Sequence, residues 1–280
     1  MELKAKGHEM KTELYFAYGS NTHPLQIKRR CPRATPIGVA TLSGFRLGWV
    51  RRRGGESRTT IVEDSTAETR GVIYAGVDLD SMDRFEGEGY TYKRRQAHVE
   101  TSEGSTPVHT YPVHTYEAIT GQTCAHPDRL SAEYATTVGH GRARHGLETP
   151  GVCLVAVYGS LRKGFENHRI LAEPADFARF VGCTHVNGLR LVDLGSFPGA
   201  YRSQDEYAVC ELYAVGPKTL DQLDRLEGHP KMYRRELANT FSGTLVQIYI
   251  YQSRRAAKKP TIPGGDWAAY KNRNQNKFLF

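Results

Sequence analysis

The sequence predicts an α+β protein built from two tandem small mixed β-barrels with flanking short helices. Three observations carry this prediction. The chain has 280 residues, about twice the usual size of a single domain. It repeats itself internally, and each half alternates short β-rich segments with two or three short helices. Hydrophobic residues make up 39% and charged residues 24% of the chain, so each half can bury a core.

The internal repeat is defined by two motifs at matched distances. The segment Tyr15–Asn21 (YFAYGSN) recurs 140 residues later as Val155–Leu161 (VAVYGSL). The segment Met82–Gly87 (MDRFEG) recurs 141 residues later as Leu223–Gly228 (LDRLEG). After each Glu-Gly pair a Tyr and an Arg follow at the same spacing, in the pattern E-G-x4-Y-x-R. Such a coincidence indicates a tandem duplication.

Apolar runs that end at glycine or at turn residues predict the strands of the first half. They are expected over 14–18, 36–50, 58–63, 70–77, 92–100 and 108–117. A helix is expected after the YGS segment, where Thr22 can act as its N-cap and Pro24 lies near its first turn. Two further helices are expected over 78–85, just before a Glu-Gly pair, and over 127–138.

The second half repeats this pattern and defines the second domain. Strands are expected over 152–158, 179–192, 207–215, 233–240 and 244–251, and helices over 165–172 and 217–226. The segment 147–151 (LETPG) is the expected junction. The predicted domains are therefore 14–147 and 151–280, the second with a basic C-terminal tail.

The YGS turn is the first candidate for a binding site in each half. A strand that stops at glycine can expose successive backbone N–H groups, and a helix N-terminus beside them favours an anion. The groups concerned would bind a carboxylate or an oxyanion, and they belong to Gly19, Ser20 and Asn21 in the first half and to Gly159, Ser160 and Leu161 in the second. A plain turn at a strand end is the alternative interpretation.

Glu86 and Glu227 are the candidate catalytic residues. Each ends a short helix, where the negative end of the helix dipole disfavours a carboxylate, and burial would raise its pKa further. Such a group is suited to taking and returning a proton near neutral pH. A solvated glutamate beside a glycine cap is the alternative. The fixed spacing of Glu, Tyr and Arg in both halves favours a site.

These motifs resemble known enzymes. FAYGSN followed by DRFEG makes residues 14–147 similar to the γ-glutamylcyclotransferase family. VYGSLRKGFENHRIL, LDRLEGHPKMYRR and IPGGDWAAY make the second half resemble the AIG2-like and γ-glutamylamine cyclotransferase group. The resemblance implies the mixed barrel of that family, no metal and no organic cofactor. It gives Glu86 and Glu227 the proton transfer, and it places Tyr18, Tyr158, Tyr92 and Tyr233 in the pocket lining.

The implied reaction is an intramolecular cyclisation. The free α-amine of a γ-glutamyl compound attacks the γ-amide carbonyl, which gives 5-oxoproline and a released amine or amino acid without water. The first half resembles enzymes that act on free γ-glutamyl amino acids, and the second resembles those that accept larger amines. Glu88 is an extra acid in the first half, where it is expected to disfavour an anionic leaving amino acid by like-charge repulsion.

Charge and cysteine content bear on partners and compartment. The net charge is +8, and residues 253–280 hold seven basic groups against one Asp. Five widely spaced cysteines without a CxxC pair, a charged N-terminus and the lack of long apolar runs favour a cytoplasmic protein without a membrane span. A small γ-glutamyl compound is the expected partner. The alternative is a non-catalytic AIG2-like module that docks an acidic partner or nucleic acid through the tail, and the sequence does not decide the oligomeric state.

Overall fold

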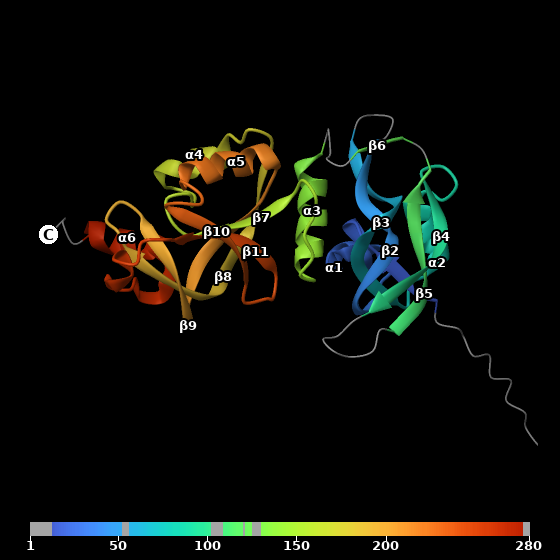
Figure 1. The fold of residues 1–280 in the computed structure, drawn as a ribbon, viewed down its shortest axis with the longest axis horizontal. Coiled ribbons are helices and arrows are strands. Elements are labelled where there is room, and N and C mark those ends of the chain that lie inside the picture. Colours follow the sequence, from blue (N-terminus) through green and yellow to red (C-terminus); the bar gives the residue numbers. More distant parts are fainter. Residues whose placement is uncertain (1–12, 52–55, 102–108, 120, 125–129, 277–280) are drawn as a thin grey trace, which may run out of the picture. The chain divides into compact units, whose positions relative to one another are not determined.

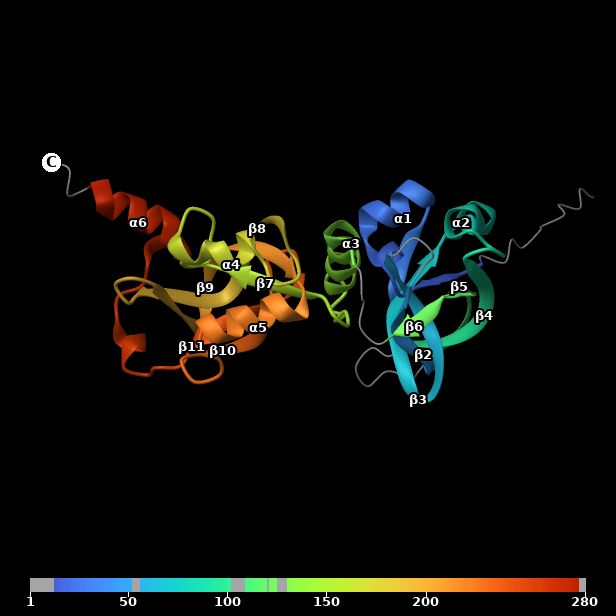
Figure 2. The same cartoon turned by 90° about the horizontal axis from the view of Figure 1, so that it is seen from above.

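A computed structural model of the chain describes residues 13–51, 56–101, 109–119, 121–124 and 130–276. The chain divides into two compact units, and the first consists of Met1–Val50 and Thr59–Thr123. The second consists of Arg51–Arg58 and Cys124–Phe280. Each unit is a mixed sheet with short helices (Figures 1 and 2), which confirms the predicted α+β class and duplicated barrel. The boundaries 14–147 and 151–280, which are drawn from the sequence repeat, stay a prediction.

The first unit contains a closed sheet. Within the described residues the strand order is β3-β1-β5-β4-β2-β6, and β3 also pairs with β2, which joins the ends of a five-strand ring. β1 runs antiparallel to β3 but parallel to β5, so the sheet is mixed. The strands are β1 (Tyr15–Ala17), β2 (Thr35–Arg51), β3 (Ser57–Ala75), β4 (Tyr92–Thr101), β5 (His109–Ala118) and β6 (Gln122–Cys124).

Two strands predicted separately, 58–63 and 70–77, form the single strand β3. Its two ends are buried, whereas the polar stretch between them is mostly exposed. Apolar patterning marks only the buried ends. The polar middle stays extended because it remains in the sheet next to β2, where the Thr69 hydroxyl also donates to the Phe45 carbonyl at 2.8 Å.

The short β1 strand is buried on both faces. Tyr15 and Ala17 pack on the side of the helices, with Ile27 and Met82. Phe16 and Tyr18 point the other way, into the barrel interior. This alternation places Tyr18 inside the barrel at the point where the chain leaves β1.

Three short helical segments complete the first unit: a 3-10 turn Ser20–Thr22, α1 (Pro24–Arg30) and α2 (Leu79–Glu86). α1 and α2 are in contact and lie side by side in Figure 2. The predicted Thr22 cap is wrong, because His23 precedes α1 while the Thr22 hydroxyl donates to the Gly19 carbonyl at 2.7 Å. α2 ends as predicted at Gly87, which has a left-handed φ of 66°, so Glu86 is the last residue of the helix.

The second unit repeats the plan. Its strand order is β10-β11-β7-β9-β8, with β7 parallel to β11, and a bridge between Val186 and Thr240 connects β8 to the end of β10. β9 starts at Pro198 rather than at the predicted 207, because residues 198–202 already pair with β8 and a register shift joins this part to the paired segment that starts at Tyr207. The strands are β7 (Cys153–Val157), β8 (Ala178–Asp193), β9 (Pro198–Val215), β10 (Tyr233–Asn239) and β11 (Leu245–Tyr251).

Helices α4 (Arg169–Ala172) and α5 (Pro217–Leu226) are in contact (Figure 1), as α1 and α2 are in the first unit. α6 (Trp267–Asn276) lies near the C-terminus. α3 (Ala132–Ala143) packs on β7, where Gly139 approaches Val152. α3 starts later than the predicted 127, and residues 127–129 lie outside the described part of the chain. The remaining 3-10 turns are Glu166–His168, Ala256–Lys258 and Pro263–Gly265.

Asp176 caps α5 from outside the helix. Its carboxylate accepts from the backbone N–H groups of Lys218 at 2.9 Å and Thr219 at 3.1 Å, while the capping residue Gly216 has no side chain to do so. Burial opposes ionisation of Asp176, but the bonds from Thr219, Phe177 and Lys218 outweigh it and hold its pKa below the usual 3.8.

We expect Asp176→Ala to lower the free energy of unfolding by about 1–2 kcal/mol at pH 7, the usual value of a lost cap. Because the folded pKa is depressed, this stabilisation is complete above pH 3.8 and disappears as the pH falls through the folded pKa. Urea unfolding at pH 7 and pH 3 measures the difference. An equal loss at both pH values would contradict the assignment of the effect to the carboxylate.

Candidate active site

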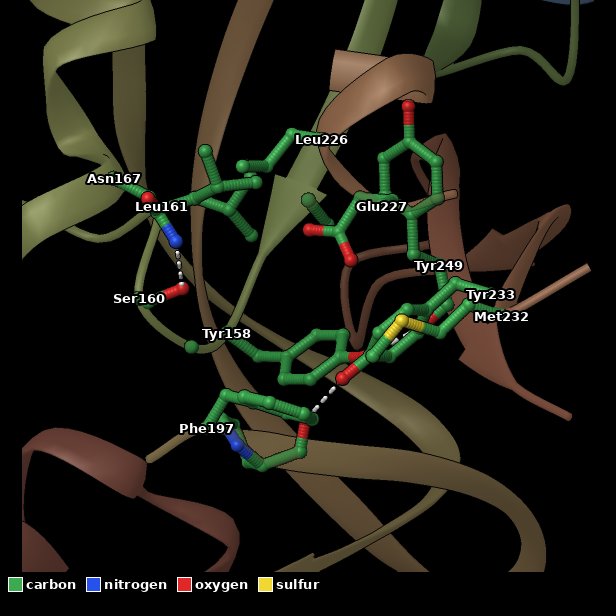
Figure 3. Close-up of a pocket in the computed structure, with 14 residues that line it drawn as sticks. Tyr158, Ser160, Leu161, Asn167, Phe197, Leu226, Glu227, Met232, Tyr233 and Tyr249 are labelled. Carbon is green, nitrogen blue, oxygen red and sulfur yellow. Dashed lines mark hydrogen bonds between the residues drawn. The ribbon is translucent and has the colours of Figure 1, made fainter. Parts of the chain in front are cut away.

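Each unit brings its YGS turn next to the glutamate at the end of a helix. In the second unit the two enclose a pocket of about 210 Å³. The YGS turn, Tyr158 to Leu161, forms one part of its lining, and Glu227 with Tyr233 forms another. Figure 3 shows the Glu227 carboxyl group projecting into this pocket near the ring of Tyr158.

Glu227 follows the last residue of α5, directly before Gly228, whose φ of 58° lets the chain turn away from the helix. Its surroundings are largely apolar, with Leu161, Leu226 and Met232 in the pocket lining. Burial, and after it the charge of Asp224, raises the pKa of Glu227 to about 7. The group can therefore exchange a proton at neutral pH.

Hydrogen bonds accepted by two backbone carbonyls stabilise the YGS turn of the second unit. The Gly159 carbonyl accepts from the Arg162 N–H at 3.0 Å, and the Ser160 carbonyl accepts from the Asn167 N–H at 3.1 Å. The Asn167 amide also donates to the Ser160 hydroxyl at 2.9 Å. Gly159 lies against Pro198 so closely that an added Cβ would come within 2.8 Å of the proline ring. A larger residue at this position would force the turn or the proline to shift.

Buried tyrosines support the pocket. Tyr158 donates to the Tyr249 carbonyl at 2.7 Å, and Tyr233 donates to the Pro198 carbonyl at 2.8 Å. The Tyr249 hydroxyl donates to Asp224 at 2.6 Å, and Asp224 also pairs with Arg235 at 3.1 Å. Burial and the bond to Asp224 raise the pKa of Tyr249, so its phenol remains a donor.

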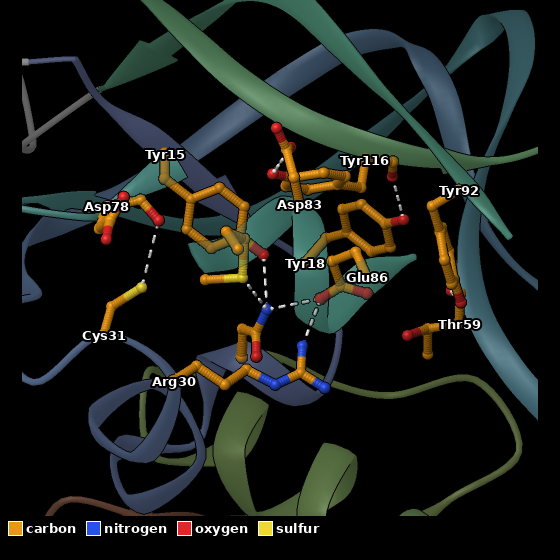
Figure 4. A network of polar contacts seen from close by, with 12 residues as sticks. Tyr15, Tyr18, Arg30, Cys31, Thr59, Asp78, Asp83, Glu86, Tyr92 and Tyr116 are labelled. Atoms are coloured by element: carbon orange, nitrogen blue, oxygen red, sulfur yellow. Dashed lines mark hydrogen bonds and ion pairs between the residues drawn. The ribbon is translucent and has the colours of Figure 1, made fainter. Parts of the chain in front are cut away.

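The first unit contains the same supporting contacts (Figure 4). Tyr18 donates to the Tyr116 carbonyl, and Tyr92 donates to the Thr59 carbonyl at 2.9 Å. The Tyr116 hydroxyl donates to Asp83 at 2.6 Å, and Asp83 pairs with Arg94 at 3.1 Å. Gly19 again approaches its neighbour closely, since an added Cβ would lie 2.2 Å from the Thr59 hydroxyl oxygen.

The two glutamates differ in their partners. Glu86 Oε1 accepts from the Asn21 amide at 3.0 Å and forms an ion pair with Arg30, whose side chain extends from α1 (Figure 4). Both members of the ion pair keep some solvent access, 18% for Arg30 and 15% for Glu86. Asn21 is buried, and its Oδ1 has no hydrogen-bond partner among the described residues. Glu227 forms no ion pair within the same described part of the chain.

The structure therefore brings the predicted residues together within each unit: Tyr18, Gly19, Ser20, Asn21, Glu86 and Tyr92 in the first, and Tyr158, Gly159, Ser160, Leu161, Glu227 and Tyr233 in the second. Their roles stay predictions.

Sequence reasoning missed the supporting pair of Asp83 with Tyr116 and its counterpart, Asp224 with Tyr249. The signal was present, because the aspartate belongs to the repeated D-R-x-E-G motif. It also missed Arg30, because a basic run such as residues 28–30 is typical of a solvent-exposed helix end. The Glu88 side chain forms a local hydrogen bond, in which its carboxylate accepts from the backbone N–H of Arg94.

The described residues include neither a candidate metal cluster nor a helix that could span a membrane. They contain no group of three or more His, Cys, Asp or Glu side chains placed to hold a metal ion. Their helices are also too short or too polar to cross a bilayer.

Comparison with known proteins shows the family of the chain. The sequence pattern of the family described as "Gamma-glutamyl cyclotransferase, AIG2-like" matches residues 15–134 and again residues 155–269. The chain belongs to this family. Each barrel of the γ-glutamyl cyclotransferase-like chain is therefore one copy of the family domain.

Two curated relatives and one solved structure each match less than half of the chain. A Vibrio cholerae protein named "putative gamma-glutamylcyclotransferase" is 39% identical over 114 residues, which are 41% of this chain and 94% of that protein. A Methanocaldococcus jannaschii protein with the same description is 34% identical over 100 residues, 35% of this chain and 81% of that one. A solved structure named gamma-glutamyl cyclotransferase is 26% identical, covers 49% of this chain and 82% of its own, and has a TM-score of 0.43.

Proposed function

We propose that the chain is a γ-glutamyl cyclotransferase that releases 5-oxoproline and a free amine or amino acid from γ-glutamyl compounds. The observation that carries the proposal is Glu227, a carboxyl group with a pKa of about 7 in a pocket beside a glycine turn. Intramolecular ring closure needs an oriented substrate and one group that moves a proton. The family membership supports the same chemistry.

The proposed reaction balances within the substrate and one carboxyl group. Glu227 takes a proton from the α-ammonium, and the free amine attacks the γ-carbonyl to form the ring C–N bond. The backbone N–H groups of the turn at Gly159 and Ser160 stabilise the oxyanion. Glu227 returns this proton to the leaving nitrogen as the original amide C–N bond breaks. The ring nitrogen of 5-oxoproline then gives up a second proton, which Glu227 passes to the released amine, so that the amine departs as an ammonium. Glu86 takes this role in the first unit.

The pocket lining supports a preference in the second unit. Leu161 stands where the first unit has Asn21, and Leu226 and Met232 add further apolar surface that is partly exposed at the rim. An uncharged amine that leaves through this opening would contact apolar side chains. The second unit is therefore proposed to act on γ-glutamyl amines with bulky, uncharged leaving groups.

The direct test is 5-oxoproline release from a panel of γ-glutamyl compounds. The panel should contain γ-glutamyl amino acids and γ-glutamyl alkylamines, each with the purified full chain. Release from at least one class supports the proposal, and no release from any member contradicts it.

The binding-module alternative gains no support from the tail. Residues 261–267 are part of the second unit: Thr261 bridges Val192, the Ile262 N–H donates to the Leu191 carbonyl at 2.7 Å, and Trp267 is fully buried. This segment packs against the barrel and holds none of the tail's seven basic groups. Retention on heparin that falls steeply with salt would be the result in favour of this alternative.

The pH profile should respond to Asp224. Because the base form of Glu227 is needed, kcat/KM should fall as the pH drops below about 7. Asp224→Asn removes the nearby negative charge and so lowers the pKa of Glu227, which moves this acid limb to lower pH. Asp221→Asn, on the exposed side of α5, is the matched control and should leave the limb in place. An unmoved limb in Asp224→Asn would contradict the contribution of Asp224.

A further inference from the structure

Arg30 is the main chemical difference between the two sites. The duplicated features, namely the Tyr-Gly-Ser turn, the helix-terminal glutamate and the tyrosine–aspartate–arginine support, occur in both units. The ion pair between Arg30 and Glu86 occurs in the first unit alone among the described residues. The lining of the second pocket contains neither arginine nor lysine. The residue at the same distance from the second YGS motif is Ile170.

The turn, the glutamate and the supporting residues occur in both sites, so they are suited to bind the part of the substrate that is the same in both sites. Under the proposed function this common part is the γ-glutamyl group, with its α-amine and α-carboxylate. The second pocket would accommodate that group without a cation in its lining. A cation present only in the first site therefore suits the part that differs between substrates, which is the leaving group.

The position of Arg30 allows such a role. It lies at the end of α1, where its guanidinium contacts Glu86 Oε1 and covers the ring of Phe85 at 5.5 Å, and its side chain is 18% exposed. A guanidinium binds a carboxylate through two parallel hydrogen bonds. A substrate carboxylate can therefore compete with Glu86 for the same group.

We propose that Arg30 is the specificity-determining residue of the first site, and that it leaves Glu86 to bind the carboxylate of an amino-acid leaving group. This inference rests on the proposed cyclotransferase function. The exchange frees Glu86 for the α-ammonium and neutralises the positive charge that would repel it. A γ-glutamyl amine lacks the second carboxylate, so Arg30 remains on Glu86 and the site works poorly. Without substrate, the ion pair with Arg30 thus keeps Glu86 from acting as a base, and a substrate with a second carboxylate breaks this ion pair.

The test uses the full chain with Glu227→Gln, so that only the first site is expected to turn over. γ-Glutamyl-alanine and γ-glutamyl-ethylamine are a matched pair, because ethylamine is alanine without its carboxylate. With Arg30 present, kcat/KM should favour γ-glutamyl-alanine. Arg30→Met should lower the ratio of the two kcat/KM values by about tenfold or more, the usual value of a charge-assisted hydrogen bond. Arg30→Lys should restore part of the ratio.

Arg29→Met is the matched control, since it removes the same charge one residue earlier from an exposed position and should leave the ratio unchanged. An equal loss on both substrates in Arg30→Met would overturn the inference, because Arg30 would then serve the shared γ-glutamyl group or only hold Glu86. No turnover in Glu227→Gln alone would also overturn it. No release of 5-oxoproline by the unmodified chain would instead reject the proposed function, and this inference with it.

Discussion

Glu227→Gln is expected to lower kcat/KM for γ-glutamyl alkylamines by about 10²–10⁴-fold, the usual contribution of a positioned general base. Glutamine keeps the size and the hydrogen-bonding capacity of the side chain, but it cannot accept the α-ammonium proton. Because Glu227 forms no ion pair among the described residues, the substitution leaves no partner charge unpaired. The measurement is 5-oxoproline release at pH 8, where the carboxylate form predominates.

Glu86→Gln is the paired variant for this experiment. It should leave alkylamine turnover largely intact and should reduce release from γ-glutamyl-alanine, while the double variant should lose both. Thermal unfolding of each variant checks that the fold is kept. If Glu227→Gln leaves alkylamine turnover intact and Glu86→Gln abolishes it, the assignment of the two sites is reversed. Full activity in the double variant would show that neither glutamate is the base.

The duplicated core of both sites could be predicted because its determinants are local. A glycine after a short buried strand and a glycine after a short amphipathic helix fix where each element ends. Glu86 and Glu227 precede such a glycine, so their positions at helix ends followed directly from the sequence. An isolated E-G pair is common in soluble proteins, so one copy alone could not predict a functional site. The prediction of a site came from the occurrence of the pair in both halves at the same spacing.

The remaining features depend on contacts between segments far apart in the chain. Arg30 and Glu86 are 56 residues apart, and the basic run around Arg30 has the pattern of an ordinary exposed helix end. The length of β3 could not be predicted from the sequence for a related reason, because hydrogen bonds to β2 keep a polar segment extended. Tyr116 has the burial pattern of a core residue, and only its bond to Asp83 reveals a second role.

The difference between the two glutamates was not visible in their motifs. Both are followed by glycine and by the same Tyr and Arg, yet one contacts two donors and the other lies in an apolar pocket. The two donors to Glu86, Asn21 and Arg30, come from the segment after the first YGS turn, where the second unit has Leu161 and Ile170. A duplication that keeps its base and its turn can thus diverge in the groups that surround the base.

Gly159→Ala is the second substitution with a large expected effect. The added Cβ would lie 2.8 Å from two carbons of the Pro198 ring, and a proline ring cannot move away without its backbone. The backbone here cannot shift freely either, because the Pro198 carbonyl accepts from Tyr233 and the residue pairs with Asp193 in the sheet. The YGS turn must therefore move, and with it the N–H groups proposed to face the oxyanion.

We expect Gly159→Ala to lower kcat/KM for γ-glutamyl alkylamines by about 10²-fold, because a displacement near 1 Å at a catalytic group has an effect of this order. The free energy of unfolding should fall by about 1–3 kcal/mol, as for other overpacked sites. Gly182→Ala on β8 is the matched control, since its added Cβ meets no atom within 4 Å and should change neither quantity measurably.

The double variant Gly159→Ala with Pro198→Ala distinguishes a displaced turn from a general loss of stability. Removing the ring relieves the contact, so the two substitutions should be strongly non-additive and part of the activity should return. If Gly159→Ala alone keeps full turnover, the turn tolerates a side chain. The backbone N–H groups beside Gly159 would then have no place in the proposed oxyanion site.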